Sequence, residues 1–380
     1  MKIIVIGAGI GGLTTAIALQ KKGLEVQVYE SASEIREVGA GLWMAANAMN
    51  VLERMGLSNE IKAAGNQLLG AGLGDHHGQP LSKVDFSKII KNYGNGTMAI
   101  HRGHLQRILL ENTLKNTVFT GKRLKNIIDT EGVIQLEFED GTHSECDILI
   151  GADGIKSVVR NHIFEDIPLR YSGQTCWRGI VKMKLSDTKN SLELWGKRAG
   201  LRACYSQVNE NEVYWYVTLK ERANLKFSTN NLKPYLLDLV SEFQSDIKKV
   251  IDQTDGNAIL HNDLYDFKPI PKWYKGNIVL MGDAAHAATP NLGQGACQAI
   301  EDAYVLADCL GKCKHPQGAF QNYQDIRIKK AQFVVNTSYQ IGLLNNIGGA
   351  LGHRVRNFLL KITPQSVADK QFDYLFKLNY

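Results

Sequence analysis

The stretch KIIVIGAGIGGL at residues 2–13 decides the fold of this chain of 380 residues. Its first part, Lys2–Ile6, is a short β-branched run that predicts a fully buried strand. A helix is expected over Gly11–Lys22, where Gly23 ends it, and a second strand follows over Leu24–Tyr29. The three segments together form a βαβ unit, which indicates an α/β fold of the Rossmann type.

The glycines between the first strand and the helix have the spacing G-x-G-x-x-G, at Gly7, Gly9 and Gly12. The first allows a tight turn, the second lets a pyrophosphate approach the backbone, and the third allows the helix to pack closely on the strand. Glu30 closes the second strand, and its carboxylate can accept hydrogen bonds from a ribose diol while repelling a 2′-phosphate. The pattern predicts a site for FAD or NAD rather than NADP; a glycine-rich turn that binds nothing is the alternative.

Composition and charge exclude several classes of protein. Hydrophobic residues make up 44% and charged residues 22%, which is typical of a globular chain, and the length allows two domains. The net charge is +6, but Lys and Arg are scattered, so no nucleic-acid partner is expected. Six cysteines without a C-x-x-C pair favour free thiols in the cytoplasm, and no metal site is expected. Polar residues interrupt the apolar segment Ile341–Leu360, so no membrane span is expected either.

From about residue 171 the sequence changes to strand-like segments. They cover Thr175–Lys184, Ser191–Trp195, Leu201–Gln207 and Val213–Leu219, and they predict a mostly antiparallel sheet inserted as a second domain. One helix is expected over Lys233–Val250, and residues 319–360 are expected to be mainly helical. Residues 64–97 are glycine-rich and expected to be irregular, with GAGLG at 70–74 interpreted as a loop because its third glycine comes one residue early for a second fingerprint.

Two further glycine motifs each follow a predicted buried strand. GADG at residues 151–154 follows the strand over Cys146–Ile150, and GDAAH at residues 282–286 follows the strand over Asn277–Met281. The second motif continues through Pro290, Gly293, Gln294 and Gly295 into a helix expected over Ala296–Leu310, which contains Glu301-Asp302-Ala303.

These motifs, in this order and spacing, resemble those of the single-component flavoprotein aromatic hydroxylases, the p-hydroxybenzoate hydroxylase-like or group A monooxygenases. The resemblance covers residues 1 to about 330, and the urate hydroxylase, salicylate hydroxylase and zeaxanthin epoxidase-like members are the most similar. It implies an α/β chain with a Rossmann-like FAD-binding domain, an inserted β-rich substrate domain and C-terminal helices. The expected divisions are a discontinuous FAD-binding domain at 1–70, 98–170 and 271–330, a substrate domain at 71–97 and 171–270, and a C-terminal helical segment at 331–380.

The resemblance also implies a set of residues at FAD. They are Gly7, Gly9, Gly11, Gly12, Glu30, Ser31, Arg36, Gly41, Trp43, Arg102, Gln106, Leu124, Asp153, Gly282, Asp283, Pro290, Gly293, Gln294, Gly295, Ala296 and Cys297. Glu30 would bind the adenosine ribose, Leu124 would contact the adenine through its backbone, and Asp283 would hold the ribityl hydroxyls. The N-terminus of the Ala296–Leu310 helix would stabilise the anionic reduced flavin.

The activity that the resemblance implies is oxygen transfer. NADH or NADPH would reduce FAD, and O2 would then form a C4a-hydroperoxide that hydroxylates or epoxidises a small planar aromatic or conjugated substrate. The expected substrate candidates are Arg202, Tyr205, Tyr214, Tyr216 and Trp43. The alternatives are a dehydrogenase or reductase on the same fold, a flavin-binding protein without activity, and a flavin-dependent halogenase. The Trp-x-Trp motif of the halogenases is absent from this sequence.

Several residues have a structural interpretation beside the functional one. Asp153 would cap a helix, Arg160 and Glu301 would form an ion pair, and His286 would be a packed, hydrogen-bonded residue rather than a base. Tyr214 and Tyr216 should share one strand face and Trp215 the other. The chain is expected to be a monomer or homodimer, with its C-terminal segment covering the substrate site or forming a dimer contact.

Overall fold

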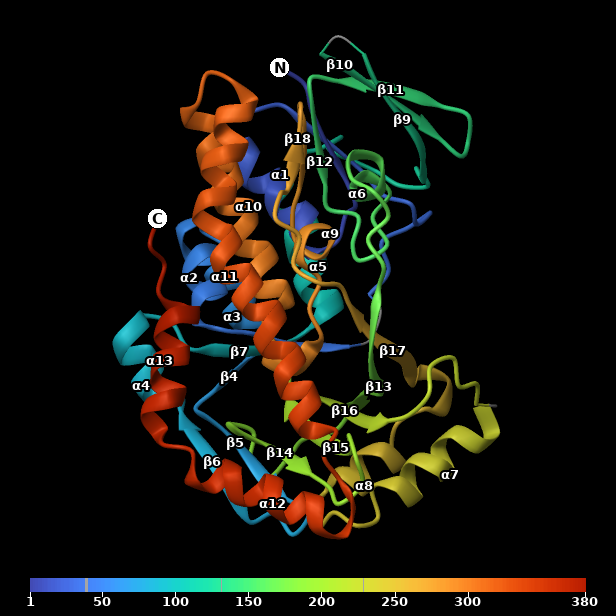
Figure 1. Cartoon of the computed structure of the whole chain (residues 1–380), viewed down its shortest axis with the longest axis vertical. Coiled ribbons are helices and arrows are strands. Elements are labelled where there is room, and N and C mark those ends of the chain that lie inside the picture. Colours follow the sequence, from blue (N-terminus) through green and yellow to red (C-terminus); the bar gives the residue numbers. More distant parts are fainter. Residues whose placement is uncertain (38–39, 131, 228) are drawn as a thin grey trace.

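The computed structural model describes residues 1–37, 40–130, 132–227 and 229–380 (Figure 1). Its N-terminal βαβ unit confirms the prediction, because Ile3 on the first strand pairs in parallel with Val26 on one side and with Ile148 on the other. In sheet order, the strands are β18 (Tyr274–Lys275), β19 (Ile278–Leu280), β12 (Ile148–Gly151), β1 (Ile3–Ile6), β2 (Val26–Tyr29) and β8 (Val118–Phe119).

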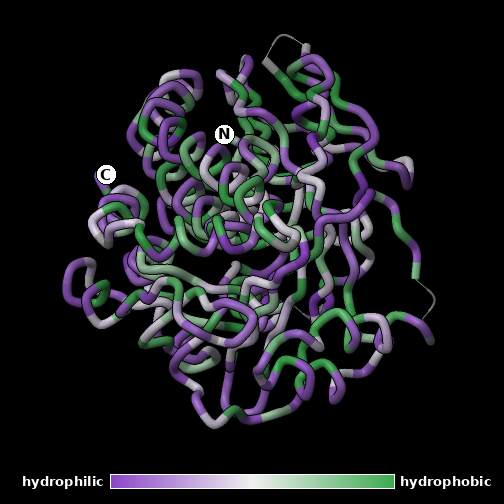
Figure 2. The backbone as a smooth tube through the Cα atoms, turned by 60° about the horizontal axis from the view of Figure 1, so that its bottom comes forward, coloured by the Kyte–Doolittle hydropathy of each residue, from purple (hydrophilic) through white to green (hydrophobic). Residues whose placement is uncertain are grey.

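Helix α1 (Ile10–Lys21) packs against this sheet, and α10 (Gly295–Lys312) packs against both α1 and α11 (Pro316–Asn345). They lie side by side in the upper part of Figure 1. A Cβ at Gly11 would lie 3.2 Å from the Cβ of Ala299, so α1 and α10 are in close contact there. Hydrophobic residues line the interior strands and helices in Figure 2, in agreement with full burial of Ile3, Ile4 and Val5.

A second sheet forms the lower half of the molecule and confirms the expected β-rich insertion. In sheet order, its strands are β17 (Leu260–Asp266), β13 (Arg170–Lys182), β16 (Glu212–Lys220), β15 (Arg202–Gln207), β14 (Asn190–Trp195), β5 (Gly70–Asp75) and β6 (Pro80–Asp85). All neighbours are antiparallel except β14 and β5, which are parallel. Helices α7 (Thr229–Leu239) and α8 (Ile247–Asp252) cover one face, where Trp177 and Trp215 are fully buried.

The prediction of a loop at residues 70–74 is wrong, because they form strand β5. Its glycines make room for neighbouring side chains: a Cβ at Gly70 would lie 2.5 Å from Oδ1 of Asn190, and one at Gly74 would lie 3.2 Å from Cδ2 of Leu192. Residues 64–97 are therefore ordered rather than irregular. They also contain β4 (Asn66–Leu68) and α4 (Phe86–Tyr93), and β4 joins β3 (Gly41–Met44) and β7 (Thr97–His101) in a three-stranded sheet.

Helices α2 (Ala46–Arg54) and α3 (Ser58–Ala64) are separated at Gly56, whose φ is +75°. The single helix expected over Lys233–Val250 is wrong, because α7 and α8 are separate. The other elements are α5 (Arg102–Glu111), β9 (Leu124–Thr130), β10 (Val133–Phe138), β11 (His143–Cys146), α6 (Val158–Ile163), η1 (Gly256–Ala258), α9 (Asp283–His286) and η2 (Pro290–Leu292).

The C-terminal part is helical, as predicted, but α11 runs without interruption across residue 331, where a boundary was expected. It is followed by α12 (Gly349–Ile362) and α13 (Gln365–Phe376), which run along the lower end and the left side of Figure 1. Within the described parts of the chain, none of the helices has the length and apolar character to span a bilayer. The pairing of β5 and β6 with strands from 170–266 supports the proposed grouping of 71–97 with 171–270.

Candidate cofactor and substrate site

In the glycine motif between β1 and α1, the fold leaves no room for a side chain at two of the glycines but leaves room at the third. A Cβ at Gly7, where φ is +103°, would lie 2.5 Å from the carbonyl oxygen of Ala152, and one at Gly12 would lie 1.8 Å from the carbonyl oxygen of Gly7. A Cβ at Gly9 would meet nothing within 4 Å. The open space at Gly9, in front of the α1 N-terminus, is what a pyrophosphate needs.

Glu30 at the end of β2 is fixed by the backbone around this turn. Its Oε2 accepts a hydrogen bond from the amide of Ala8 at 2.8 Å, and its Oε1 accepts from the amide of Ala32 at 2.8 Å and from Ser31 Oγ at 3.1 Å. Gln106 Nε2 donates to the carbonyl of Ala8 at 2.8 Å. These bonds hold the carboxylate beside the turn, where a ribose would lie.

A pocket of about 470 Å³ opens beside this carboxylate, within the usual range for a small-molecule site. Gly9, Glu30, Arg36, Arg102 and Gln106 line it, so five of the residues expected at the cofactor lie together. Residues 38–39, between the expected cofactor residues Arg36 and Gly41, lie outside the described residues. Leu124 is buried at the start of β9, and the amide of Lys122 just before it donates to the carbonyl of Glu30 at 2.8 Å.

Asp283 and Arg102 act on each other across the interior of this region. Burial raises the pKa of Asp283, while the charges of His286 and Arg102 oppose that change. Burial lowers the pKa of Arg102, and Asp283 and Glu30 oppose it. Asp283 begins α9 after Gly282, whose φ of +54° allows the turn out of the β19 strand. A carboxylate in this position is a strong acceptor for a polyol such as a ribityl chain.

The N-terminus of α10 is open for a ligand. Pro290 begins η2, Gly293 has a left-handed φ of +62°, and Gln294 precedes the helix without a capping side chain. No acidic residue lies in the first turn of α10, so its amide groups and partial positive charge remain available to an anionic group. Ala296 lies in this first turn, and the thiol of Cys297 is 3.6 Å from the carbonyl oxygen of Trp43 on β3.

Asp153 caps a helix, which was the structural alternative to its expected role at the cofactor. It caps α6, because its Oδ2 accepts from the amides of Val158 at 2.7 Å and Val159 at 3.1 Å, and Ser157 Oγ donates to its Oδ1. Burial raises the pKa of Asp153, and these hydrogen bonds counteract that rise. The carbonyl of Ala152 beside it contacts Gly7, so the motif also shapes the glycine turn.

The expected ion pair between Arg160 and Glu301 is wrong. Arg160 donates to the carbonyls of Ile155 and Ala284, and its guanidinium lies 4.6 Å from the ring centre of Phe267. Glu301 instead pairs with Arg327 and Lys330 of α11, at 2.7 and 2.8 Å. Sequence alone does not show this, because the pairing depends on how α11 packs on α10.

His286 is buried and shares a hydrogen bond of 2.5 Å with Asp302, whose other oxygen accepts from Arg327 at 2.8 Å. Asp302 Oδ2 also accepts from the amide of Gly282 at 3.0 Å. His286 therefore has the packed, hydrogen-bonded position that was predicted, and it orders the loop that carries Asp283.

Three substrate candidates lie together on the face of the second sheet opposite to α7 and α8, and Trp43 of β3 lies against the same face. Arg202 is 2% exposed, and its guanidinium lies 3.5 Å from Glu193 and donates to Asn291 Oδ1 of η2 at 2.6 Å. Tyr216 donates to the other oxygen of Glu193. The ring of Tyr214 lies 6.0 Å from that of Tyr216, which confirms that the two tyrosines share a face.

Tyr214 packs directly on the backbone of β3. A Cβ at Gly41 would lie 2.3 Å from Cγ of Tyr214, so only glycine fits there. Trp43, two residues further on, donates its indole N–H to Ser206 Oγ at 3.1 Å. The loop of η2, strand β3 and the inner face of the second sheet therefore meet at this point.

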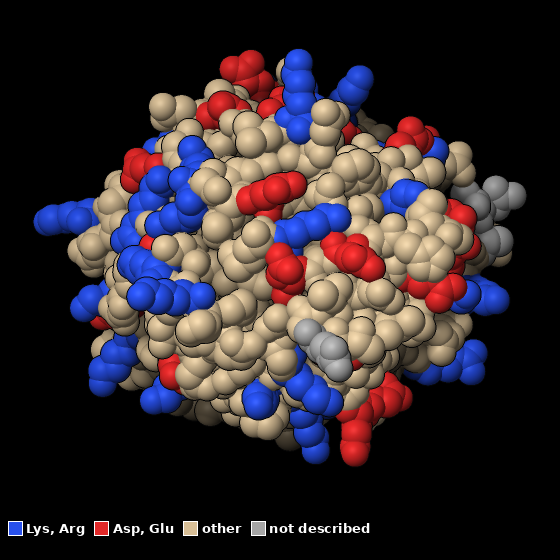
Figure 3. Space-filling model, turned by 90° about the horizontal axis from the view of Figure 1, so that it is seen from above, with Lys and Arg blue, Asp and Glu red and all other residues tan. Residues whose placement is uncertain are grey.

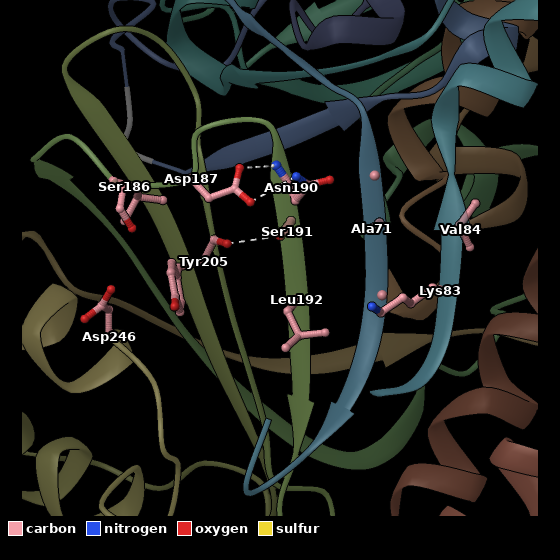
Figure 4. Close-up of a pocket in the computed structure, with 13 residues that line it drawn as sticks. Ala71, Lys83, Val84, Ser186, Asp187, Asn190, Ser191, Leu192, Tyr205 and Asp246 are labelled. Atoms are coloured by element: carbon pink, nitrogen blue, oxygen red, sulfur yellow. Dashed lines mark hydrogen bonds between the residues drawn. The ribbon is translucent and has the colours of Figure 1, made fainter. Parts of the chain in front are cut away.

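Tyr205 lies apart from the other candidates. In the strand register it is opposite Trp215, which places both on the outer face, beside α8. There it lines an open groove of about 490 Å³ with Asp246, Ser186 and Leu192 (Figure 4). We therefore leave Tyr205 out of the proposed substrate site.

Glu193, Asn291 and Ser206 are polar residues of this site that sequence reasoning missed. Glu193 lies between two leucines on a strand that is otherwise apolar around it, which was an available signal for an inward carboxylate. Asn291 follows Pro290 within a motif that was already assigned to the cofactor.

Comparison with known proteins agrees with this geometry. The profile of the family described as FAD binding domain matches residues 1–338. The chain is 32% identical to the aurachin C monooxygenase/isomerase of Stigmatella aurantiaca, covering 97% of this chain and 96% of the relative. It is also 32% identical to the 2-heptyl-3-hydroxy-4(1H)-quinolone synthase of Pseudomonas aeruginosa, covering 99% and 98%.

A solved structure has the same fold over nearly the whole chain. The crystal structure of Klebsiella pneumoniae HpxO with FAD and uric acid superposes with a TM-score of 0.91 at 25% identity, covering 99% of this chain and 96% of that one. The glycine turn, the fixed Glu30, the pocket beside it and the open α10 N-terminus have the chemistry that an FAD site needs. The chain belongs to the FAD binding domain family and is an FAD-dependent monooxygenase of the group A aromatic hydroxylases.

Proposed function

We propose that this monooxygenase hydroxylates a neutral, planar heteroaromatic compound with a ring carbonyl, a ring N–H and an alkyl chain, the alkylquinolone class. The observation that carries the proposal is the buried ion pair of Arg202 with Glu193 on the inner face of the second sheet. The name of one full-length relative specifies a product with these features, a heptyl chain on a 3-hydroxy-4(1H)-quinolone.

The charge balance of the pair favours a neutral ligand. Burial works against the charge of Arg202, but the attraction of Glu193 outweighs it, so the pKa of Arg202 is raised. An anionic substrate would compete with Glu193 for the same guanidinium and would face a carboxylate at close range. A neutral ring avoids that repulsion, since Arg202 can donate to its carbonyl while Glu193 accepts from its N–H.

The tyrosines of this wall are donors and apolar surfaces, not bases. Burial, followed by the charge of Glu193, raises the pKa of Tyr216 well above its ordinary value, and burial also raises the pKa of Tyr214. Both side chains therefore stay neutral at physiological pH. The Tyr214 ring and Trp43 provide flat apolar surface for an aromatic ligand and exclude water from it.

When bound, FAD accepts electrons from NADH or NADPH and activates O2. The chain contributes position: the Arg202–Asn291 hydrogen bond connects the substrate wall with the loop that leads into α10. We propose that the expected residues of that loop, Pro290 and Gly293 to Cys297, hold the flavin ring, and that Gly282, Asp283, Gly11, Gly12 and Ser31 contribute to the rest of the cofactor site.

The test is oxygen incorporation by the purified FAD-loaded enzyme. With 2-heptyl-4(1H)-quinolone, NADH or NADPH and labelled O2, we expect a singly hydroxylated product that contains one labelled oxygen atom. Urate serves as the anionic comparison, and we expect little turnover of it. Consumption of the reduced nucleotide without labelled product from any neutral bicyclic ring would support a dehydrogenase or reductase instead.

Two further features of the proposal are the cellular location and the state of assembly. All six cysteines are free thiols, which supports work in the reducing cytoplasm. Both basic side chains (Lys and Arg) and acidic side chains (Asp and Glu) are present on the face shown in Figure 3. This mixture of charges supports a small-molecule ligand rather than nucleic acid. We propose a monomer or a homodimer, to be distinguished by sedimentation.

A further inference from the structure

Helix α12 has an apolar stripe on its solvent side. Leu351, Val355, Phe358 and Ile362 are 71%, 50%, 61% and 57% exposed. At 3.6 residues per turn these four positions lie within roughly 60° of one another around the helix axis. Large apolar side chains are common singly on protein surfaces, but a continuous stripe on one helix marks a surface that binds something. Leu359, 46% exposed, widens this α12 stripe.

The opposite side of α12 is fixed to the protein. His353 and Arg356 are buried, and the guanidinium of Arg356 lies 5.1 Å from the ring centre of Trp195 and donates to the carbonyl of Gly196 at 2.9 Å. The helix start is also held, because the amide of Gly349 donates to the carbonyl of Lys197 at 3.0 Å. The α12 stripe therefore faces outward because the helix is anchored through its polar side, the reverse of an ordinary surface helix.

The charges near the α12 stripe are basic. Arg354 and Lys361 are exposed on α12, and Lys197 and Arg198 are exposed beside its start. The sequence contains no Asp or Glu between Ile326 and Ala368. Glu242 acts on Arg356, on the buried side of the helix. An outward apolar stripe beside basic residues matches an interface that is apolar inside and anionic at its surface.

From this combination we infer that the α12 stripe binds the surface of an anionic lipid bilayer, with the helix lying flat in the headgroup region. A second copy of the chain is the weaker occupant for two reasons. A helix of 14 residues is about 21 Å long and 10 Å wide, so its outer side offers roughly 200 Å². A stable interface needs about 800 Å² from each partner. A two-fold contact would also bring the basic Arg354 and Lys361 of the two copies close together.

Membrane binding through α12 would also affect how the substrate reaches the enzyme. This link to the substrate rests on the proposed function; the membrane binding itself does not. Trp195, under Arg356, donates to Glu193, which pairs with Arg202. Arg356, Trp195 and Glu193 therefore form an unbroken chain of contacts from α12 to the proposed substrate wall. A substrate with an alkyl chain dissolves in bilayers, so a docked enzyme would take it from the membrane rather than from water.

The experiment is co-sedimentation of the full-length, FAD-loaded protein with vesicles of phosphatidylcholine, with and without phosphatidylglycerol. We expect binding to the vesicles that contain phosphatidylglycerol, and we expect it to weaken as salt is added. The double variant Leu351→Gln and Phe358→Gln should reduce the bound fraction by about tenfold or more, because two exposed apolar side chains are lost. Arg354→Gln with Lys361→Gln should reduce the preference for phosphatidylglycerol, because two of the four basic residues are lost.

The matched control is the double variant Leu114→Gln and Val133→Gln, which removes two exposed apolar residues elsewhere, 66% and 41% exposed. It should bind as the wild type does. Sedimentation without vesicles tests the competing occupant. Absence of vesicle binding, equal binding by the Leu351 and Phe358 variant, or a dimer that this variant converts to monomer would each overturn the inference. Because no substrate is present, the result does not depend on the proposed function.

Discussion

The guanidinium of Arg202 donates a hydrogen bond of 2.6 Å to Oδ1 of Asn291. This bond joins the inner face of the second sheet to the loop that precedes α10. Asn291 is itself held in place, since its Nδ2 donates to Ser338 of α11 at 2.8 Å and to Thr289 Oγ1 at 3.0 Å. The proposed substrate wall and the loop before α10 are therefore joined by direct hydrogen bonds.

Loss of this bond should impair catalysis more than cofactor binding. For Asn291→Ala we expect kcat/KM to fall by about ten- to a hundredfold, the usual cost of removing a hydrogen bond to a charged group. FAD content should stay unchanged. Asn112→Ala is the control, because Asn112 also forms a hydrogen bond with a charged side chain, Glu60 at 2.8 Å, but at an exposed position away from the second sheet. Equal losses in both variants would contradict a role for the Arg202–Asn291 bond.

Neutralising Glu193 should change which ligands bind. In Glu193→Gln, Arg202 keeps its charge but loses its anionic partner, so anionic aromatic ligands such as urate should bind more tightly, by about tenfold. The neutral quinolone should bind more weakly, because the amide is a poorer acceptor for its N–H. Perturbation of the flavin absorption spectrum during titration measures both affinities. Glu212→Gln on strand β16 of the same sheet is the control. A uniform weakening of both ligands would argue against charge balance as the cause.

Two glycine substitutions should separate folding from cofactor binding. Gly9→Ala should leave the thermal stability of the cofactor-free protein unchanged, because its methyl group meets no protein atom within 4 Å. It should still reduce FAD affinity by about tenfold or more, since the methyl group occupies the place of the pyrophosphate.

Gly12→Ala should instead reduce the stability of the cofactor-free protein, because its Cβ would lie 1.8 Å from the carbonyl oxygen of Gly7. Differential scanning calorimetry and FAD titration distinguish the two effects. Gly256→Ala, which also meets nothing within 4 Å, is the control and should change neither property. Normal FAD binding by Gly9→Ala would refute the assignment of that space.

The buried Asp302 should make stability depend on pH. Burial acts against its charge, but His286 and Arg327 outweigh that effect and hold the pKa of this carboxyl far below its ordinary value. A depressed folded-state pKa stabilises the fold fully above the unfolded-state value near pH 4, and this contribution is lost as the pH falls further.

Asp302→Asn should therefore lower the free energy of unfolding by about 3–5 kcal/mol at neutral pH, because it leaves Arg327 in a buried position with one partner fewer. The difference from the wild type should shrink below pH 4, as urea titrations would show. Asp140→Asn, at an exposed pair with Lys122, should have a far smaller effect. A difference that stays constant with pH would contradict the assigned ionisation.

Much of the cofactor site could be predicted from the sequence, because its determinants are local. The turn at Gly7–Gly12 and the left-handed Gly293 are set by backbone sterics within a few residues. The loop prediction at residues 70–74 failed for the opposite reason. Glycine is a poor strand former by itself, and β5 exists because side chains of β14 fill the space above its glycines.

The tyrosines show the division most clearly. Strand alternation by itself determines that Tyr214 and Tyr216 share a face and that Arg202 and Tyr205, three residues apart, do not. Only the tertiary structure decided which face turns toward the η2 loop, because the choice depends on α7 and α8 burying Trp177 and Trp215 on the other side. The Arg202–Glu193 pair and the outward stripe of α12 likewise depend on long-range packing, which no local pattern encodes. The sequence alone thus determined the family and the glycine turn, and the packing of the second sheet decided the charge of the substrate wall.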